Sequence, residues 1–278
     1  MAPGLVTPLT RGVGGIGILR DLLPGWATPL VVGVTQLGDV WFVLALLVAV
    51  YWFRDRRRGA LGLGLLFGAF GLTVALKAAF GLPRPPPGVR LTAVESYGFP
   101  SGHAIAATVA WGALALVLDA GSKRARAAVA GGVVAVVALS RVALGVHYVV
   151  DVLAGIAVGA GYLVVGVSVA RGDPRRAFAL AVGLGVVAVG ASTAAADALV
   201  ALGGAVGALA AWIGTTVPEA PWGRGEAVPA ALGGGGAALA FVAAVELAPP
   251  PVGALLGAFA AGGVVGLPAV LGDQNVSR

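Results

Sequence analysis

Residues 127–170 read AAVAGGVVAVVALSRVALGVHYVVDVLAGIAVGAGYLVVGVSVA. Apart from Arg141, His147 and Asp151, this stretch contains no charged residue and no histidine. About 20 apolar residues are enough to cross the hydrocarbon core of a bilayer as a helix. The stretch therefore predicts two membrane-spanning helices, at 127–144 and 147–170, joined by a tight connection near Gly145.

The composition of the whole chain has the same character. Of its 278 residues 59% are hydrophobic and 11% are charged, and the mean hydropathy is +0.97. A soluble domain carries about 25% charged residues, so a polytopic membrane protein is expected, with the bilayer as its surroundings. The absence of cysteine excludes disulfides and thiol chemistry. The net charge of +6 is not gathered on one exposed face, so no nucleic-acid partner is expected.

Further apolar segments lie on both sides of this stretch. Residues 1–28 are mixed and rich in Gly and Pro, which predicts an interfacial segment. Residues 29–176 are predicted to form the core of an all-α, polytopic transmembrane helical bundle, with earlier spans at 29–53, 59–80 and 101–119. Residues 177–278 are predicted to add C-terminal transmembrane helices of unknown role, at 177–201, 202–217, 231–247 and 251–271.

Basic residues indicate which ends of the spans face the cytoplasm. The loops at 54–58, 122–126 and 171–176 are rich in Lys and Arg, and they fall on one side if every span crosses once. Lys and Arg mark the cytoplasmic side of membrane proteins. The Pro-rich loop at 81–100 and the turn at 141–147 are therefore predicted on the extracytoplasmic face.

The polar residues on that face suit a phosphate group. Transfer of a phosphoryl group requires fixed positive charge and donors aimed at its oxygens, and Lys77, Arg84 and Arg141 would supply the charge. Ser101 stands where a helix N-cap is expected. The free N–H groups that follow it, beginning at Gly102, would point toward an anion.

The two histidines of the chain suggest different roles. His147 and Asp151 are four residues apart and share one face of a helix. A carboxylate on one ring nitrogen fixes the tautomer and leaves the other nitrogen free to attack, so we interpret His147 as the nucleophile and Asp151 as its orienting partner. His103 is interpreted as the acid that protonates the leaving oxygen. No carboxylate cluster suited to a metal is visible, and we expect no metal and no cofactor.

Together these residues form three motifs with a known parallel. The pattern K-x6-RP, PSGH and SR-x5-H-x3-D resembles the signature of the type 2 phosphatidic acid phosphatase (PAP2) superfamily over roughly residues 30–170. The resemblance implies a PAP2-like helical membrane core, metal-independent hydrolysis of a phosphomonoester or diphosphate, and His147 as the phosphorylated residue. Its positions here are Lys77, Arg84, Pro85, Pro100, Ser101, Gly102, His103, Ser140, Arg141, His147 and Asp151.

Two residues have competing interpretations. Asp39 lies some ten residues into the first span, where a carboxylate is a functional candidate, or else the span is shorter and Asp39 lies at the outer interface. Ser140 either supports the site from behind or only caps and packs.

The function also has alternatives. The leading hypothesis is an integral membrane phosphatase acting on a lipid phosphate, either an isoprenoid (polyprenyl) diphosphate or a phosphatidic-acid-like lipid. A lipid phosphotransferase would use the same intermediate, and a non-catalytic membrane protein would only bind the anion. The oligomeric state is left open.

Overall fold

The computed structural model describes residues 24–215 and 249–272. The predicted interfacial segment 1–28 lies almost entirely outside this range, and so does the predicted span at 231–247. Every regular element among the described residues is helical, which confirms the all-α class. The α-helices are α2 Thr28–Thr35, α3 Val40–Phe53, α4 Arg56–Phe80, α5 Gly102–Val117, α6 Lys123–Ala143, α7 Val149–Ala170, α8 Pro174–Ala191, α9 Ala196–Gly214 and α11 Pro250–Gly272.

Within the described ranges, five helices are long and apolar enough to cross a bilayer, namely α4, α6, α7, α8 and α9. The helices α2 and α3 together would form a sixth span, bent by 49°. Helix α5 is shorter, but it is apolar and packs between α4, α6 and α7. A helix is therefore present at each predicted span up to residue 170, but α5 is shorter than the candidate spans and the first span is broken.

The first span is broken, whereas the sequence predicted one continuous helix over 29–53. A short 3-10 turn, η3 Gln36–Gly38, separates α2 from α3. Asp39 then caps α3, with its Oδ1 accepting the backbone N–H of Trp41 at 3.0 Å. Aspartate is among the strongest N-cap residues, so the polar side chain inside an apolar segment starts a new helix.

The boundary between the two spans predicted at 177–201 and 202–217 is also wrong. Helix α8 ends at Ala191 and α9 begins at Ala196. Between them the chain turns through Thr193 and Ala194, which have φ values of +52° and +63°. These residues are small and apolar or weakly polar, so the turn leaves little trace in the hydropathy pattern.

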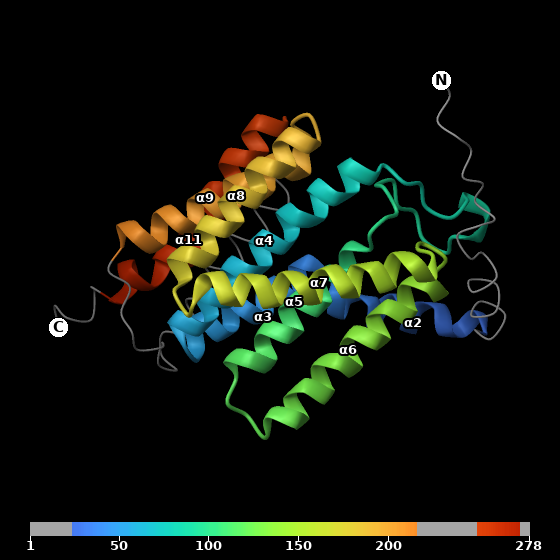
Figure 1. The fold of residues 1–278 in the computed structure, drawn as a ribbon, viewed down its shortest axis with the longest axis horizontal. Helices are drawn as coiled ribbons and strands as arrows, with labels where there is room; N and C mark the ends of the chain where they lie inside the picture. The colour runs from blue at the N-terminus through green and yellow to red at the C-terminus, as the bar shows by residue number, and fades with distance from the viewer. Residues whose placement is uncertain (1–23, 216–248, 273–278) are drawn as a thin grey trace.

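Helix α4 is the central element of the bundle (Figure 1). It contacts α3, α5, α7, α8 and α9, and Leu63 and Leu66 on it are buried against α3 and α8. Helices α8, α9 and α11 pack together on one side of α4, while α5, α6 and α7 lie on the other. Two side chains of α3 reach α11: Tyr51 Oη donates to the carbonyl of Val265 at 2.5 Å and Trp52 Nε1 to that of Val264 at 3.0 Å.

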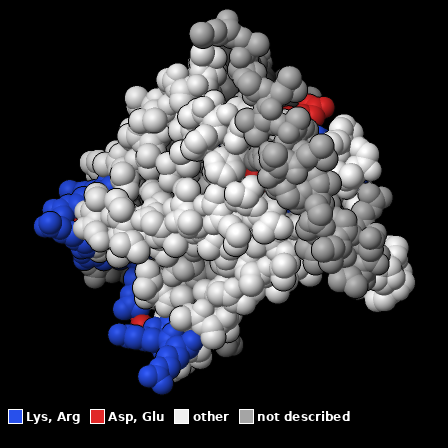
Figure 2. Space-filling model, turned by 45° about the vertical axis from the view of Figure 1, so that its right-hand side comes forward, with Lys and Arg blue, Asp and Glu red and all other residues white. Residues whose placement is uncertain are grey.

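The outer surface is apolar along the helices and basic at one end. Val164 on α7 and Leu116 on α5 are 68% and 60% exposed, as expected for side chains that face lipid. Figure 2 shows a broad uncharged surface with Lys and Arg gathered at its left and lower edges. Exposed basic residues at the loop ends include Arg54, Arg57, Lys123, Arg124, Arg171 and Arg175. The three motifs lie at the opposite ends of the helices.

Candidate active site

The structure brings the three predicted motifs together at one end of the bundle. Lys77 is in the last turn of α4, and Arg84 follows in the loop after it. Ser101 caps α5. Arg141 is in the last turn of α6, and His147 lies in the short connection between α6 and α7. Residues up to 70 positions apart in the sequence, from Lys77 to His147, thus converge on one site.

His147 lies between a guanidinium and a carboxylate. Its Nε2 is 2.9 Å from Nη1 of Arg84, and its Nδ1 is 3.5 Å from Oδ2 of Asp151. The 3.5 Å separation is longer than an ordinary hydrogen bond, and catalytic hydrogen bonds often shorten only in the substrate complex. Asp151 Oδ2 also accepts the backbone N–H of Tyr148 at 2.9 Å, which fixes the direction of the carboxylate.

These contacts determine the protonation state of His147. A guanidinium has only donors, so the Nε2 that faces Arg84 is an acceptor and carries no proton. The proton of the neutral ring is then on Nδ1, toward Asp151. Burial, and then the positive charges of Arg84, Arg141 and Lys77, hold the pKa of His147 well below its usual value of 6.5. The ring is therefore neutral at neutral pH, and its Nε2 carries a lone pair that accepts from Arg84.

Arg84 is the most extensively held cation of the site. Its Nε donates to the carbonyl of Ser96 at 2.7 Å and its Nη2 to the hydroxyl of Ser96 at 2.9 Å. Its Nη1 donates to the carbonyl of Val146 at 2.9 Å, beside its contact with His147. Burial and the nearby charge of Arg90 lower the pKa of Arg84 to about 10, so it stays charged at neutral pH.

Ser96 is a site residue that sequence reasoning missed. Its Oγ lies 3.2 Å from Nζ of Lys77 as well as 2.9 Å from Nη2 of Arg84. One hydroxyl thus contacts two cations from different segments. Ser96 belongs to none of the three motifs, and nothing in the pattern of the polar loop at 81–100 marks it.

Arg141 is held from the other side by the first span. Its Nη1 donates to Oγ1 of Thr35 at 3.0 Å. Its Nε is buried and has no hydrogen-bond partner among the described residues. A buried donor without a partner costs about 1–3 kcal/mol, and an anion bound at the site would satisfy it. Thr35 was also missed, although its place in the polar run before Asp39 could have signalled it.

The second motif packs directly against the third. The backbone N–H of Ser101 donates to the carbonyl of Asp151 at 3.0 Å, and its hydroxyl accepts the N–H of Ala104 at 3.4 Å as the predicted N-cap of α5. A Cβ on Gly102 would lie 3.9 Å from Nζ of Lys77. The N-terminus of α5, with its free N–H groups, therefore faces the cations of the site.

His103 contacts a carboxylate that sequence reasoning left with two interpretations. Its Nε2 lies 3.7 Å from Oδ2 of Asp39, at the start of α3. The structure therefore places Asp39 beside the predicted acid. Ser140, by contrast, donates its hydroxyl to the carbonyl of Val137 in its own helix at 2.6 Å. This contact fits the capping and packing interpretation of Ser140.

The loop and the turn that carry Arg84 and His147 are tied to each other. The N–H of Leu91 donates to the carbonyl of Leu144 at 2.9 Å. Gly145 has φ of +69°, and a Cβ there would lie 2.1 Å from the carbonyl oxygen of Val89. Only glycine combines this left-handed conformation with such close approach. The tight connection predicted near Gly145 is therefore also what allows the loop to lie against the turn.

The site is built from cations and histidines rather than metal ligands. Among the residues the structure describes, no group of three or more His, Cys, Asp or Glu side chains could hold a metal ion. The nearby positive charges of Lys77, Arg84 and Arg141 suit an anion.

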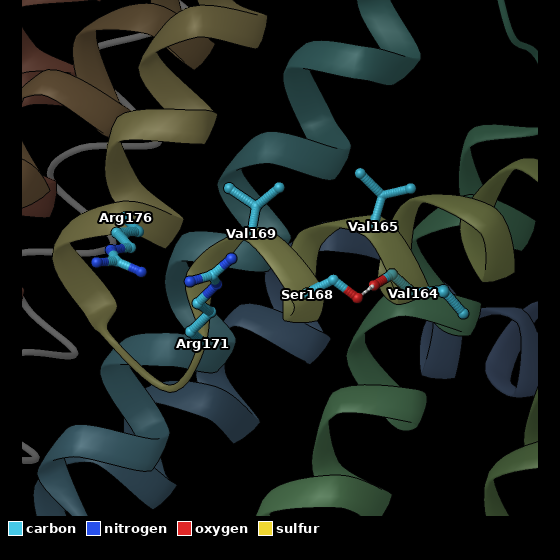
Figure 3. A pocket seen from close by; sticks show the side chains of 6 residues that line it. All are labelled: Val164, Val165, Ser168, Val169, Arg171 and Arg176. Carbon is cyan, nitrogen blue, oxygen red and sulfur yellow. Dashed lines mark hydrogen bonds between the residues drawn. The ribbon is translucent and has the colours of Figure 1, made fainter.

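Two cavities lie at opposite ends of the bundle. One of about 520 Å³ is at the end with the basic loops (Figure 3), and neither histidine lines it. Its lining residues are Val164, Val165, Ser168, Val169, Arg171 and Arg176. The other, of about 410 Å³, is bordered by Arg84, Arg90, Glu95 and Ser96 in the motif loop. The second cavity is therefore the one next to the predicted chemistry.

Comparison with known proteins places the chain in a family. Residues 57–172 match the model of the PAP2 superfamily. Phosphatidylglycerophosphatase B of Bacillus subtilis (strain 168) is 33% identical over 145 residues, which cover 48% of this chain and 70% of that protein. The chain belongs to the PAP2 superfamily. The region that matches the family model ends at residue 172, so α8, α9 and α11 lie outside that region.

Two further PAP2-type similarities agree with this assignment. Decaprenylphosphoryl-5-phosphoribose phosphatase of Mycobacterium tuberculosis (strain ATCC 25618 / H37Rv) is 33% identical over 149 residues, 51% of this chain and 80% of that protein. The crystal structure of a transmembrane PAP2-type phosphatidylglycerolphosphate phosphatase from Bacillus subtilis superposes with a TM-score of 0.51 at 29% identity, covering 58% of this chain and 86% of that one. The resemblance, the helical membrane fold and the phosphatase class predicted from the motifs are confirmed.

Proposed function

We propose that this PAP2 protein hydrolyses a lipid phosphate or diphosphate through a phosphohistidine at His147, without a metal ion. The observation that carries the proposal is the pair of contacts made by the buried imidazole of His147. Arg84 donates toward its Nε2 at 2.9 Å, and Asp151 lies 3.5 Å from its Nδ1. The lone pair on Nε2 of the neutral ring accepts from Arg84. When phosphoryl oxygens take the donors of that guanidinium, the same lone pair is positioned to attack the phosphorus atom.

The first half-reaction forms the phosphohistidine. Nε2 of His147 attacks phosphorus, and the bond from phosphorus to the leaving oxygen breaks, with its electron pair going to that oxygen. His103 gives the leaving oxygen a proton. Meanwhile Lys77, Arg84 and Arg141 balance the negative charge on the phosphoryl oxygens, as positively charged clamps do in other phosphoryl transfers.

The second half-reaction releases phosphate. A water molecule attacks the phosphorus of the phosphohistidine, and His103, now neutral, takes a proton from that water. The bond from phosphorus to Nε2 breaks, and its electron pair returns to the ring. His147 is then neutral again and His103 is protonated, so the enzyme is ready for the next substrate.

The names of the relatives suggest a substrate class. Phosphatidylglycerophosphate and decaprenylphosphoryl-5-phosphoribose both carry a phosphomonoester on a polyol that is joined to a lipid. The cavity beside Arg84 has Arg90 and Glu95 on its wall, so it offers a cation for a second phosphate and a carboxylate for polyol hydroxyls. We therefore place lipid-linked polyol phosphates first among the substrates, ahead of polyprenyl diphosphates and phosphatidic acid.

The site is assigned to the extracytoplasmic face. The support is the distribution of charge, since the exposed basic loops lie at the other ends of the same helices and Lys and Arg favour the cytoplasmic side. Right-side-out vesicles should hydrolyse a substrate added outside without permeabilisation. Turnover only after permeabilisation would reverse the orientation.

The experiment that tests the function is a substrate panel with purified protein in lipid nanodiscs. Phosphate release is measured from lipid-linked polyol phosphates, polyprenyl diphosphate and phosphatidic acid, for the wild type and for His147→Ala. The wild type should release phosphate and the variant should not, while both keep the same melting temperature. Formation of a new ester when an alcohol is added would indicate a phosphotransferase. Phosphate binding without turnover of any substrate would leave only an anion-binding protein.

A further inference from the structure

Two side chains, one on each side of the break in the first span, contact residues of the active site. Thr35, just before the break, accepts a hydrogen bond from Nη1 of Arg141 at 3.0 Å. Asp39, just after it, lies with Oδ2 3.7 Å from Nε2 of His103. The 3-10 turn Gln36–Gly38 lies between these two residues, and the helical segments on either side of the break are bent by 49°.

The carboxylate of Asp39 is fixed in its direction. Its Oδ1 accepts the N–H of Trp41 at 3.0 Å and so caps α3, which leaves Oδ2 to face His103. The two side chains are also partly sheltered, with His103 26% and Asp39 27% exposed. An Asp cap is worth about 1 kcal/mol, so the carboxylate cannot rotate away from His103 without losing that stabilisation.

The turn itself is held against the helix that carries His103. A Cβ on Gly38 would lie 2.5 Å from Cγ1 of Val137 and 3.1 Å from the carbonyl oxygen of His103. Trp111, on the same helix as His103, donates its Nε1 to the carbonyl of Leu37 at 2.9 Å. The glycine thus allows the close approach, and the tryptophan fixes the register of the turn.

The surroundings of His103 are otherwise positive. Arg141 on α6, Lys77 on α4 and Arg84 in the motif loop act on it electrostatically, together with His147. Within residues 24–215 and 249–272, Asp39 is the one carboxylate at ion-pair distance from His103. A proton on the His103 ring therefore has a single nearby anionic partner from the protein.

We infer that Asp39 is a positioning residue that holds His103 as the proton donor for the leaving oxygen. Oδ2 of Asp39 pairs with the N–H at Nε2 of the imidazolium, which leaves the N–H at Nδ1 for the leaving group. Asp39 itself gains and loses no proton; the proton passes from His103 to the leaving oxygen and is replaced from the attacking water. The inference rests on the proposed phosphohistidine chemistry.

The test compares two leaving groups in one variant. An alkoxide, as from dodecyl phosphate, needs a proton as it leaves, whereas 4-nitrophenolate does not. Asp39→Asn removes the charge but keeps the cap, because Asn caps as well as Asp. The variant should lose about 10- to 100-fold in kcat/KM on dodecyl phosphate, part of the ~10²–10⁴-fold that a general acid supplies, and less than about 3-fold on 4-nitrophenyl phosphate. The alkaline limb of its rate profile on dodecyl phosphate should move to lower pH.

The matched control is Asp173→Asn. Asp173 caps α8 at the other end of the bundle, with its Oδ1 accepting the N–H of Arg175 at 2.9 Å, so this variant should leave both rates unchanged. Equal losses on the two substrates, or no loss on either, would overturn the role of Asp39. If Asp39→Asn does not fold, Asp39→Ser keeps a cap and is measured in the same way. Wild-type protein that hydrolyses neither substrate nor any lipid phosphate would refute the proposed function instead, and the inference with it.

Discussion

Replacing Arg84 by lysine tests how far the site depends on the shape of this cation rather than on its charge. The guanidinium makes four contacts through three nitrogens: with the carbonyl and hydroxyl of Ser96, with the carbonyl of Val146, and with Nε2 of His147. The lysine ammonium is a single point charge on a flexible stem, and it cannot keep more than two of these four contacts. Arg84→Lys therefore keeps the charge but loses the planar arrangement.

The size of the effect follows from the contacts that are lost. A hydrogen bond from a charged donor contributes about 1.5–3 kcal/mol, so loss of two such contacts costs at least about 3 kcal/mol. If these contacts hold the cation in the geometry that the transition state requires, kcat/KM should fall by about 100-fold, at 1.36 kcal/mol for each factor of ten. The assay is phosphate release from the best substrate of the panel, with KM and kcat measured separately.

Arg126→Lys is the matched control for this substitution. Arg126 lies at the opposite end of the bundle, where its guanidinium donates to the carbonyls of Ala115 and Gly121. It should change kcat by less than about 3-fold. An Arg84→Lys enzyme whose kcat/KM stays within about 3-fold of the wild type would refute the reasoning, because the arrangement of donors on the planar guanidinium would then be unnecessary.

Further predictions concern the groups around Arg84 and His147. Ser96→Ala should lower kcat/KM about 10-fold without lowering the melting temperature. The reason is that its hydroxyl contacts both Lys77 and Arg84, which is worth about 1–1.5 kcal/mol. An unchanged rate would mean that the backbone carbonyl of Ser96 is enough to hold Arg84 in place. Asp151→Asn, which can still accept the N–H of Tyr148, should slow kcat by about 10²- to 10⁴-fold with the fold intact, and a wild-type rate would show that Asp151 is only structural. Because the pKa of His147 is lowered in the folded protein, the unfolded chain binds a proton there that the folded one does not. Stability should therefore be constant above about pH 6.5 and fall as the pH drops below it, and a thermal-melting series from pH 8 to 5 that rises toward acid would contradict this sign.

Much of this site could be predicted because its functional residues occur in short sequence motifs. The cations and the capped helix start at Ser101 follow from residue type and spacing. The pairing of His147 with Asp151 was also predicted, but the predicted shared helix face was wrong, because α7 begins at Val149 and His147 lies in the connection before it. The location of these residues at one end of the bundle followed from counting apolar spans, since helices that cross a bilayer alternate in direction. These predictions needed no knowledge of side-chain contacts.

The contacts that hold the cations could not be predicted in the same way. Thr35 meets Arg141 across 106 positions of the sequence, and Ser96 meets Lys77 only because the loop folds back over the end of α4. Both depend on tertiary packing. The broken first span is different, because Gly38 followed by Asp39 is a helix-start signal inside an apolar run, and greater weight on the cap than on hydropathy would have found it.

The central claim is that His147 carries the phosphoryl group, and rapid-quench labelling tests it most directly. Enzyme and ³²P-labelled substrate are mixed for a single turnover and quenched in alkaline detergent, which preserves phosphohistidine, and the labelled peptide is identified by mass spectrometry. The label should appear on His147 before free phosphate is complete and should be absent from His147→Ala. A first turnover that yields free phosphate with no label on His147 at any time, or with the label on another residue, would contradict the account.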